Sequence, residues 1–220
     1  MKRSFILFFV LLMFFLCISF ASAESEGVFS LCEGKLVYLL ENGEIAKNTT
    51  VDNFCFDENG FYTSGDDMVD TYVREVLENN TDDSMSQEER LRAVYKYVVN
   101  NCSYRIGNIH EVGEDGWQID EAKYMIEKNN RGNCYAFAAI FRELARAVGY
   151  PAEAYSGEIK GMETNRTPHG WVEIEIDGEV YFFDTEIEQI HLYDDPCDMY
   201  MMPLDSPDTL RWGYNRDPEK

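Results

Sequence analysis

Cys134, His169 and Asp184 lie far apart in the chain, but together these residue types could carry out nucleophilic chemistry. Asn133 is a good helix N-cap, and apolar residues follow it at helical spacing, so Cys134 is predicted at the first position of an amphipathic helix. Unpaired N–H groups and the helix dipole favour a thiolate there. We therefore predict Cys134 as the nucleophile of an acyl-transfer reaction; the simpler interpretation is a small buried cysteine.

A predicted β-hairpin places the other two side chains. The runs 171–176 and 180–184 alternate like strands, and the Asp-Gly pair at 177–178 is a strong signal for a two-residue turn. In that register His169 lies diagonally from Asp184 on one face of the sheet, at roughly 7 to 8 Å between backbones. We predict His169 as the base that takes the thiol proton and Asp184 as the residue that orients the imidazole.

Two alternatives stay open for this hairpin. The same register sets Glu186 on a strand directly opposite His169, which makes Glu186 a rival third member of the site. His169 could also be a surface histidine at a sheet edge. The other histidines, His110 and His191, have no acid placed beside them by a hairpin.

Hydrophobic periodicity and helix-capping residues predict the elements around the site. Apolar residues recur at helical spacing from Asp66, and Ser86 with Glu89 forms a capping box that begins a second helix. A shorter third helix is predicted over 119–128. Glycines at 107, 113 and 116 mark the loop before it, and the final segment from 196 is expected to wrap the domain.

The stretch 24–65 is predicted as short β segments separated by turns, with two Asn-Gly pairs 17 residues apart. Its aromatic, acidic and Asn-Gly units resemble the cell-wall-binding repeats of bacterial surface proteins. A plain β-hairpin region packed on the following domain is the other interpretation. The predicted division is a signal peptide at 1–23, this β region at 24–65 and a catalytic domain at 66–220.

The chain begins with a predicted secretory signal. Two basic residues precede an apolar stretch over 5–20, and a small-residue Ala-Ser-Ala site ends at Ala23. We expect a secreted or extracellular protein, associated with the cell wall if the repeats function, with no membrane segment after cleavage. An uncleaved anchor is the alternative.

Charge and cysteine count restrict the partners and the redox state. A net charge of −22 repels phosphate backbones, so nucleic acid is not expected as a partner. Of the six cysteines, Cys17 leaves with the signal, and the remaining odd number leaves at least one thiol unpaired. One possible disulfide pairing joins Cys32 to Cys55 and Cys102 to Cys197. The alternative is that these four thiols stay reduced.

Several blocks of the chain together resemble the transglutaminase-like superfamily over roughly residues 68 to 190. The blocks are Gly-Asn-Cys at 132–134, Arg-Ala-Val-Gly-Tyr-Pro-Ala at 146–152, His-Gly-Trp-Val-Glu-Ile at 169–174, Asp-Gly at 177–178 and Tyr-Phe-Phe-Asp at 181–184. The resemblance implies a papain-like α+β fold, in which the helix bearing the Cys134 nucleophile packs on an antiparallel sheet bearing the His169 base and the orienting Asp184. Gly170 and Thr185 stand where the family usually has alanine and proline, which concerns fine geometry only.

The expected function is an exported enzyme that forms a thioester on Cys134 from an amide or peptide, as a peptidase or amidase acting on protein, peptide or cell-wall peptide. A cross-linking transglutaminase and a non-catalytic wall-binding module are the alternatives. No metal or cofactor is expected, since His-Glu-x-x-His, Cys-x-x-Cys and phosphate-loop patterns are absent from the sequence.

Two further predictions concern groups near the nucleophile. The backbone N–H of Cys134 is expected to bind the oxyanion, with a second donor from Trp117, Gln118 or Tyr104. The segment from Glu158 to Thr167 precedes His169 and is predicted to be a gating loop.

Overall fold

Helices and mostly antiparallel strands are interspersed along the chain in this computed structural model, which describes residues 27–107, 115–161, 165–193 and 196–217. The elements are β1 (Gly27–Cys32), β2 (Lys35–Leu40), β3 (Thr49–Val51), β4 (Phe54–Phe56), β5 (Tyr62–Thr63), α1 (Asp67–Asn80), α2 (Gln87–Asn101), β6 (Ser103–Tyr104), α3 (Trp117–Glu127), β7 (Arg131–Gly132), α4 (Cys134–Ala147), β8 (Glu153–Lys160), β9 (Arg166–Ile176), β10 (Glu179–Phe183), α5 (Thr185–Ile190), β11 (Met202–Pro203), α6 (Pro207–Trp212) and β12 (Asn215–Arg216). The predicted α+β class is confirmed.

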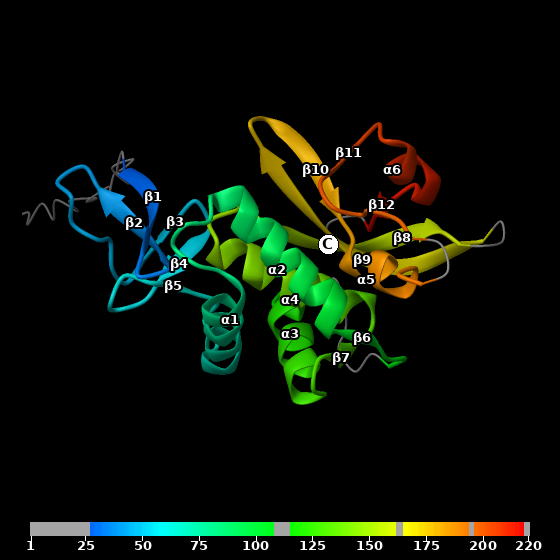
Figure 1. Cartoon of the computed structure of the whole chain (residues 1–220), viewed down its shortest axis with the longest axis horizontal. Helices are drawn as coiled ribbons and strands as arrows, with labels where there is room; N and C mark the ends of the chain where they lie inside the picture. The colour runs from blue at the N-terminus through cyan, green and yellow to red at the C-terminus, as the bar shows by residue number, and fades with distance from the viewer. Residues whose placement is uncertain (1–26, 108–114, 162–164, 194–195, 218–220) are drawn as a thin grey trace, which may run out of the picture.

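Helix α4 lies at the centre of the main core. Its apolar residues are buried on all sides because α1, α2 and α3 contact one part of its surface and β8 and β9 another (Figure 1). The helix begins where the Asn133 side chain accepts a hydrogen bond from the N–H of Ala136 at 3.2 Å. It ends before Gly149, whose φ of +93° lies in the left-handed region that favours glycine. Core packing thus fixes the helix that carries Cys134.

The main sheet is antiparallel, with strand order β11-β10-β9-β8-β12. The predicted hairpin register is confirmed, since Ile176 pairs with Glu179 and Val172 with Phe183. Asp177 and Gly178 both have positive φ, as a tight two-residue turn requires. The C-terminal tail (196–217) supplies both edge strands, β11 and β12, and so wraps the sheet as predicted.

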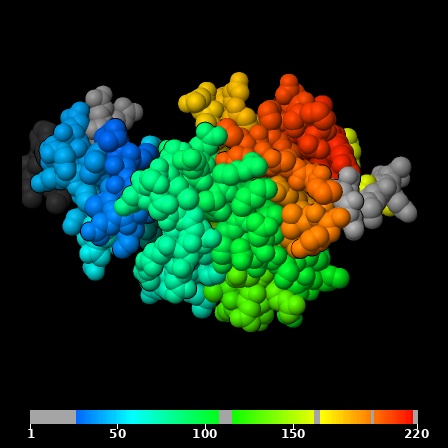
Figure 2. All heavy atoms as spheres, in the orientation of Figure 1, coloured from blue at the N-terminus to red at the C-terminus, as the bar shows by residue number. Residues whose placement is uncertain are grey.

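The N-terminal strands form a small region at one end of the molecule (Figures 1 and 2). β1 pairs with β2, β3–β4–β5 form a second sheet, and the two share a small apolar cluster around Tyr38 and Phe54. Arg146 at the end of α4 lies over the Phe54 ring at 4.6 Å, and the Tyr62 hydroxyl donates to Glu143 at 2.8 Å. The predicted β segments are confirmed, and wall binding by this region stays a prediction.

The cysteine pairing considered from the sequence is wrong in this structure. Cys32, Cys55, Cys102 and Cys197 are all free thiols among the residues described. Cys102 is buried in the main core, whereas Cys197 packs against a second cluster around Trp171, so the two belong to different cores. The Sγ of Cys55 instead lies 3.5 Å from the Thr50 hydroxyl of the neighbouring strand.

The predicted loop from Glu158 to Thr167 is mostly strand. Glu158 pairs with Pro168 and Lys160 with Arg166, which leaves a connection at 161–165, and its residues 162–164 lie outside the described part. A gating role for this segment therefore stays a prediction.

Two other predictions fall outside the described ranges, the signal peptide at 1–23 and His110. Within those ranges, every helix is too short or too polar to cross a bilayer.

Candidate active site

Cys134 is fixed at the start of α4 by contacts on both sides of it. The Asn133 amide donates to the carbonyl oxygen of Gly107 at 3.0 Å, and the N–H of Arg105 donates to that of Gly132 at 2.7 Å. A Cβ on Gly132 would lie 2.4 Å from the Cβ of Ala136, so this position requires glycine. The buried Cys134 side chain is thereby held at the helix start, as predicted.

His169 lies on the central strand β9, which packs directly on the first turn of α4. A Cβ on the next residue, Gly170, would lie 2.7 Å from the Cδ1 atom of Tyr135 and 3.0 Å from its Cα. The family that the chain resembles usually has alanine at this position. Glycine has no Cβ, so it allows β9 to lie closer to α4. The imidazole is buried and stacks on Trp171, with ring centroids 6.5 Å apart and an interplanar angle of 12°. A surface histidine at a sheet edge is excluded.

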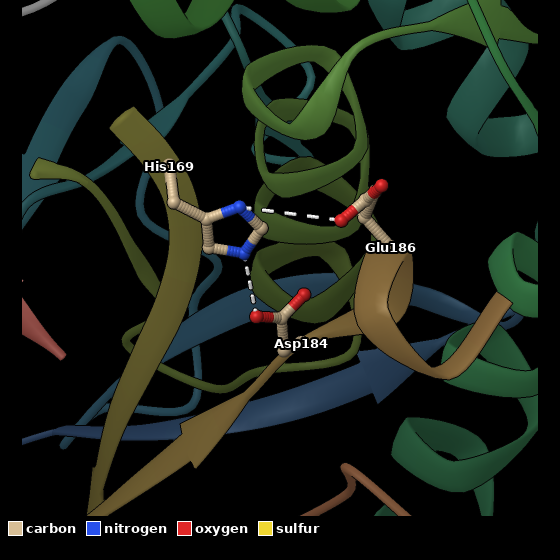
Figure 3. A group of neighbouring side chains, drawn as sticks. All are labelled: His169, Asp184 and Glu186. Atoms are coloured by element: carbon tan, nitrogen blue, oxygen red, sulfur yellow. Dashed lines mark hydrogen bonds and ion pairs between the residues drawn. The ribbon is translucent and has the colours of Figure 1, made fainter. Parts of the chain in front are cut away.

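Asp184 ends the hairpin and caps the short helix α5. Its Oδ1 accepts from the N–H of Ile187 at 3.0 Å. Its Oδ2 lies 2.7 Å from His169 Nε2 (Figure 3). The same oxygen accepts from the Tyr214 hydroxyl at 2.8 Å. The carboxylate is therefore held by three partners against one nitrogen of the ring.

The two neighbours of His169 change its protonation. Burial lowers the pKa of His169, but the charge and hydrogen bond of Asp184, together with the nearby Cys134, raise that pKa well above its ordinary value. Because Asp184 occupies Nε2, Nδ1 is the nitrogen left for Cys134. The arrangement favours a protonated His169 near Cys134, and a positive ring can stabilise negative charge that develops there.

The strand position predicted for Glu186 is wrong. Once Asp184 caps α5, the chain turns into a helix, and Glu186 lies in its first turn. Its Oε2 atom is 4.0 Å from Nδ1 of His169, on the other side of the ring from Asp184 (Figure 3). Burial raises the pKa of Glu186 to about 7; the charge of His169 opposes this shift and that of Asp184 adds to it. Glu186 therefore cannot replace Asp184 at Nε2.

The C-terminal tail supports the site in a way that the sequence reasoning missed. Besides the Tyr214 hydroxyl on Asp184, Arg216 donates to the Glu173 carboxylate at 2.8 Å, and the same oxygen accepts from the Trp171 indole N–H at 2.8 Å. Trp171 is the residue that stacks on His169. The aromatic composition of the tail is visible in the sequence, but no spacing signal joins it to the hairpin.

The three side chains considered as oxyanion donors have different surroundings. Trp117 is buried and packs edge-on against Tyr135 at 6.0 Å between centroids, and Gln118 makes no hydrogen bond among the residues described. Tyr104 is 46% exposed and pairs with Gly132, directly before the helix that Cys134 begins. Partial burial raises the pKa of Tyr104, and charge on Cys134 and Glu186 adds to the shift, so its phenol interacts electrostatically with the candidate nucleophile.

His169, Asp184 and Glu186 could also hold a metal ion, since one donor atom from each lies within 4.8 Å of the others. The hydrogen bond from His169 to Asp184 already uses two of the donors in this group. An ion would compete with that bond.

Residues 70–185, just over half of the chain, match the sequence model of the Transglutaminase-like superfamily. A solved structure from Cytophaga hutchinsonii, provisionally described as a cysteine protease, is 21% identical with a TM-score of 0.38, covering 53% of this chain and 37% of that one. Another, from Parabacteroides distasonis ATCC 8503 and provisionally described as a protease, is 13% identical with a TM-score of 0.37, covering 73% of this chain and 35% of that one.

This chain thus spans little more than a third of either solved protein. No curated protein matches it. The superfamily match supports a cysteine-type enzyme in general terms and does not separate hydrolysis from transamidation. On that match, the chain belongs to the transglutaminase-like superfamily.

Proposed function

We propose that the protein is an exported cysteine-type acyl-transfer enzyme that cleaves amide or peptide bonds through a thioester on Cys134. The observation that carries the proposal is the shared imidazole: His169 Nε2 lies 2.7 Å from Asp184, and the buried Cys134 is close enough to the same ring to help raise its pKa. These side chains come from α4, β9 and the end of β10, elements that the core and the hairpin hold rigidly. Such pre-organisation is what nucleophilic catalysis requires.

In the proposed reaction the thiolate of Cys134 attacks the carbonyl carbon, and the carbonyl electrons move to oxygen. The backbone N–H of Cys134 at the helix start donates to this oxyanion. When the C–N bond breaks, the imidazolium of His169 gives its Nδ1 proton to the leaving amine, and a thioester remains. Water then adds to the thioester carbon, the neutral imidazole takes its proton, the C–S bond breaks, and the thiolate is restored with release of the acid.

The cross-linking alternative differs only in the acceptor, since a primary amine would replace water. We put water first because it is always present as an acceptor. The proposed substrates are proteins or peptides, cell-wall peptides among them, and the proposed localisation is extracellular. Support for export comes from the basic, apolar and small-residue segments of the first 23 residues.

An activated ester tests the proposal directly. Mixing the purified protein with para-nitrophenyl acetate should release about one equivalent of nitrophenolate in a burst, followed by a slower steady state. Intact mass should show one added acetyl group, and peptide mapping should place it on Cys134. Replacing Cys134 by serine should remove the rapid thiol burst, whereas Cys55→Ser, which alters an exposed thiol, should leave it unchanged. A burst that survives Cys134→Ser would rule out this nucleophile.

A further inference from the structure

The carboxylate of Glu186 is largely buried, and no protein donor uses its hydrogen-bonding capacity. Only 7% of its side-chain surface is exposed, and it makes no hydrogen bond among the residues described. Within that part of the chain, the fully enclosed polar atoms without a partner belong to Glu121, Tyr200 and Trp212, so the Glu186 oxygens keep some contact with solvent. Their unused acceptor sites can therefore receive a small molecule beside His169.

Two acids on the same segment show the contrast. Asp184 accepts three hydrogen bonds. Glu188 accepts from the Tyr95 hydroxyl at 2.8 Å and from the N–H of Met199 at 2.9 Å, and it pairs with Lys96. Glu186 lies between them in sequence and has its nearest charged partner, His169, at 4.0 Å.

The distance between Glu186 and His169 leaves room for a small molecule that bridges the two side chains. At 4.0 Å the Oε2 and Nδ1 atoms are too far apart for a direct hydrogen bond. Two hydrogen bonds of about 2.8 Å that meet at one bridging atom span this distance with an angle of about 90° at that atom. Because Nδ1 is also the nitrogen left for the Cys134 sulfur, a bridging atom would lie beside the thioester. It must carry two hydrogens, one for each partner, as water and primary amines do.

We propose that Glu186 is a further catalytic residue that holds the acyl acceptor, a water or a primary amine, against His169 Nδ1 while the thioester on Cys134 is broken. This inference rests on the proposed function and deepens it. One hydrogen of the acceptor bonds to the Glu186 carboxylate and stays on the acceptor until the C–S bond has broken. The other proton passes to Nδ1 as the new bond to the carbonyl carbon forms.

The surroundings of Glu186 fit this role. Burial raises the pKa of Glu186 to about 7; the charge of His169 opposes this shift and that of Asp184 adds to it. Burial also raises the pKa of Tyr104, and the charges of Cys134 and Glu186 add to that shift, so the phenol and Glu186 interact electrostatically. When Nδ1 gains the acceptor's proton, the imidazolium beside it favours the ionised carboxylate. The ionised carboxylate is thus favoured as the proton reaches Nδ1, while Glu186 still accepts from the acceptor's other hydrogen.

The burst experiment separates this step from acylation. Glu186→Leu, which removes both acceptor oxygens, should keep the nitrophenolate burst of the parent protein but slow the steady state on the order of 10- to 100-fold. The acetylated protein should therefore accumulate in intact-mass spectra. Glu186→Asp keeps a carboxylate on a shorter stem and should recover part of the rate. Asp217→Asn, which removes an exposed acid of the tail, is the matched control and should leave both phases unchanged.

Added methylamine distinguishes the two acceptors. If methylamine speeds the steady-state release of nitrophenolate, and N-methylacetamide forms with the parent protein but not with Glu186→Leu, the site accepts primary amines as well as water. Acetate as the sole product at every amine concentration would assign it to water.

Two results would overturn the inference, and they can be told apart. A normal burst with a normal steady state in a folded Glu186→Leu protein would sink it while leaving the proposed function standing. The absence of any burst in the parent protein would remove the proposed function and this inference together. Thermal unfolding of each variant shows whether it is folded.

Discussion

The two ends of helix α4 hold buried charged groups in opposite ways. At its C-terminal end, Glu143 is fully buried and fully partnered, since it pairs with Arg142 and accepts from the Tyr62 hydroxyl at 2.8 Å. Arg146 extends this network to the Glu153 carboxylate at 2.9 Å and to the carbonyl oxygen of Asn53 in the N-terminal region. At the other end, Cys134 and His169 face Glu186, whose oxygens have no hydrogen bond among the described residues.

This contrast separates architecture from chemistry. A buried ionic network with every acceptor filled fixes one arrangement of the elements that it joins, here the N-terminal strands and α4. A largely buried group with a free acceptor does not fix the arrangement of the surrounding elements, but it can still bind a reacting molecule. Mutations at the two ends should therefore change different measurements: stability at the C-terminal end and rate at the N-terminal end.

The largest effect is expected for Asp184→Asn. An asparagine can still cap α5 through its one carbonyl oxygen, which accepts from the N–H of Ile187. Its amide NH2 group then faces His169 Nε2 in place of a carboxylate oxygen. The ring loses the acceptor that keeps the proton on Nε2 and leaves Nδ1 free to act as the base. The acylation burst should slow by roughly 10³- to 10⁴-fold, with little change in thermal unfolding. Stopped-flow nitrophenolate release measures the rate. A rate within tenfold of the parent protein would show that the carboxylate does not orient the imidazole.

The converse variant is Glu143→Gln at the opposite end of the helix. Without its charge, the mostly buried Arg142 loses its closest partner, and the free energy of unfolding should fall by about 3 kcal/mol. The burst rate per folded molecule should not change, because Cys134 lies about nine residues away along the helix, or roughly 14 Å. Urea unfolding measures the loss. Glu153→Gln, at a carboxylate with 38% of its side chain exposed, is the matched control and should lose much less.

A third variant tests whether every unfilled acid near the site contributes to chemistry. Glu121 on α3 is fully buried, and neither of its oxygens has a partner. Burial, with some help from Asp120, raises its pKa to about 7, so the native state holds this proton more tightly than the unfolded chain does. Its contribution to stability is present below the ordinary glutamate pKa and is lost as pH rises toward 7.

Glu121→Leu should accordingly stabilise the protein by about 2 kcal/mol, more at pH 8 than at pH 5, without slowing the burst. Urea unfolding at the two pH values measures this difference, with Glu127→Gln, at an exposed acid on the same helix, as control. A slower burst would mean that Glu121 acts on the reaction and that the contrast drawn above is too simple.

Local sequence signals predicted most of the fold and the three main site residues. The Asp-Gly turn fixed the register of β9 and β10, because a two-residue loop allows one pairing of alternating strands. The Asn133 cap and the Ser86–Glu89 capping box fixed the starts of α4 and α2 by hydrogen bonds within one turn. These predictions depend on residues within a few positions of one another.

The parts that were missed depend on distant residues. Tyr214 reaches Asp184 across 30 positions, and Arg216 reaches Glu173 across 43, with no periodic pattern that joins them. Glu186 was placed on a strand because alternation was extended past Asp184, although that aspartate is itself a helix cap. The sequence therefore predicts the candidate reacting groups better than it predicts the groups that hold them in place.

The smallest effect is expected where the tail meets the triad. Tyr214→Phe keeps a ring that lies 5.0 Å from Trp171 and 5.4 Å from Phe182, and it removes only the hydroxyl that donates to Asp184. Losing one hydrogen bond to a charged group should slow acylation about tenfold while the unfolding temperature changes little. Tyr193→Phe, at a side chain that is 91% exposed, should change neither measurement. If Tyr214→Phe reacts at the parent rate, then His169 and the α5 cap hold Asp184 without the tail, and the support of the site ends with the hairpin itself.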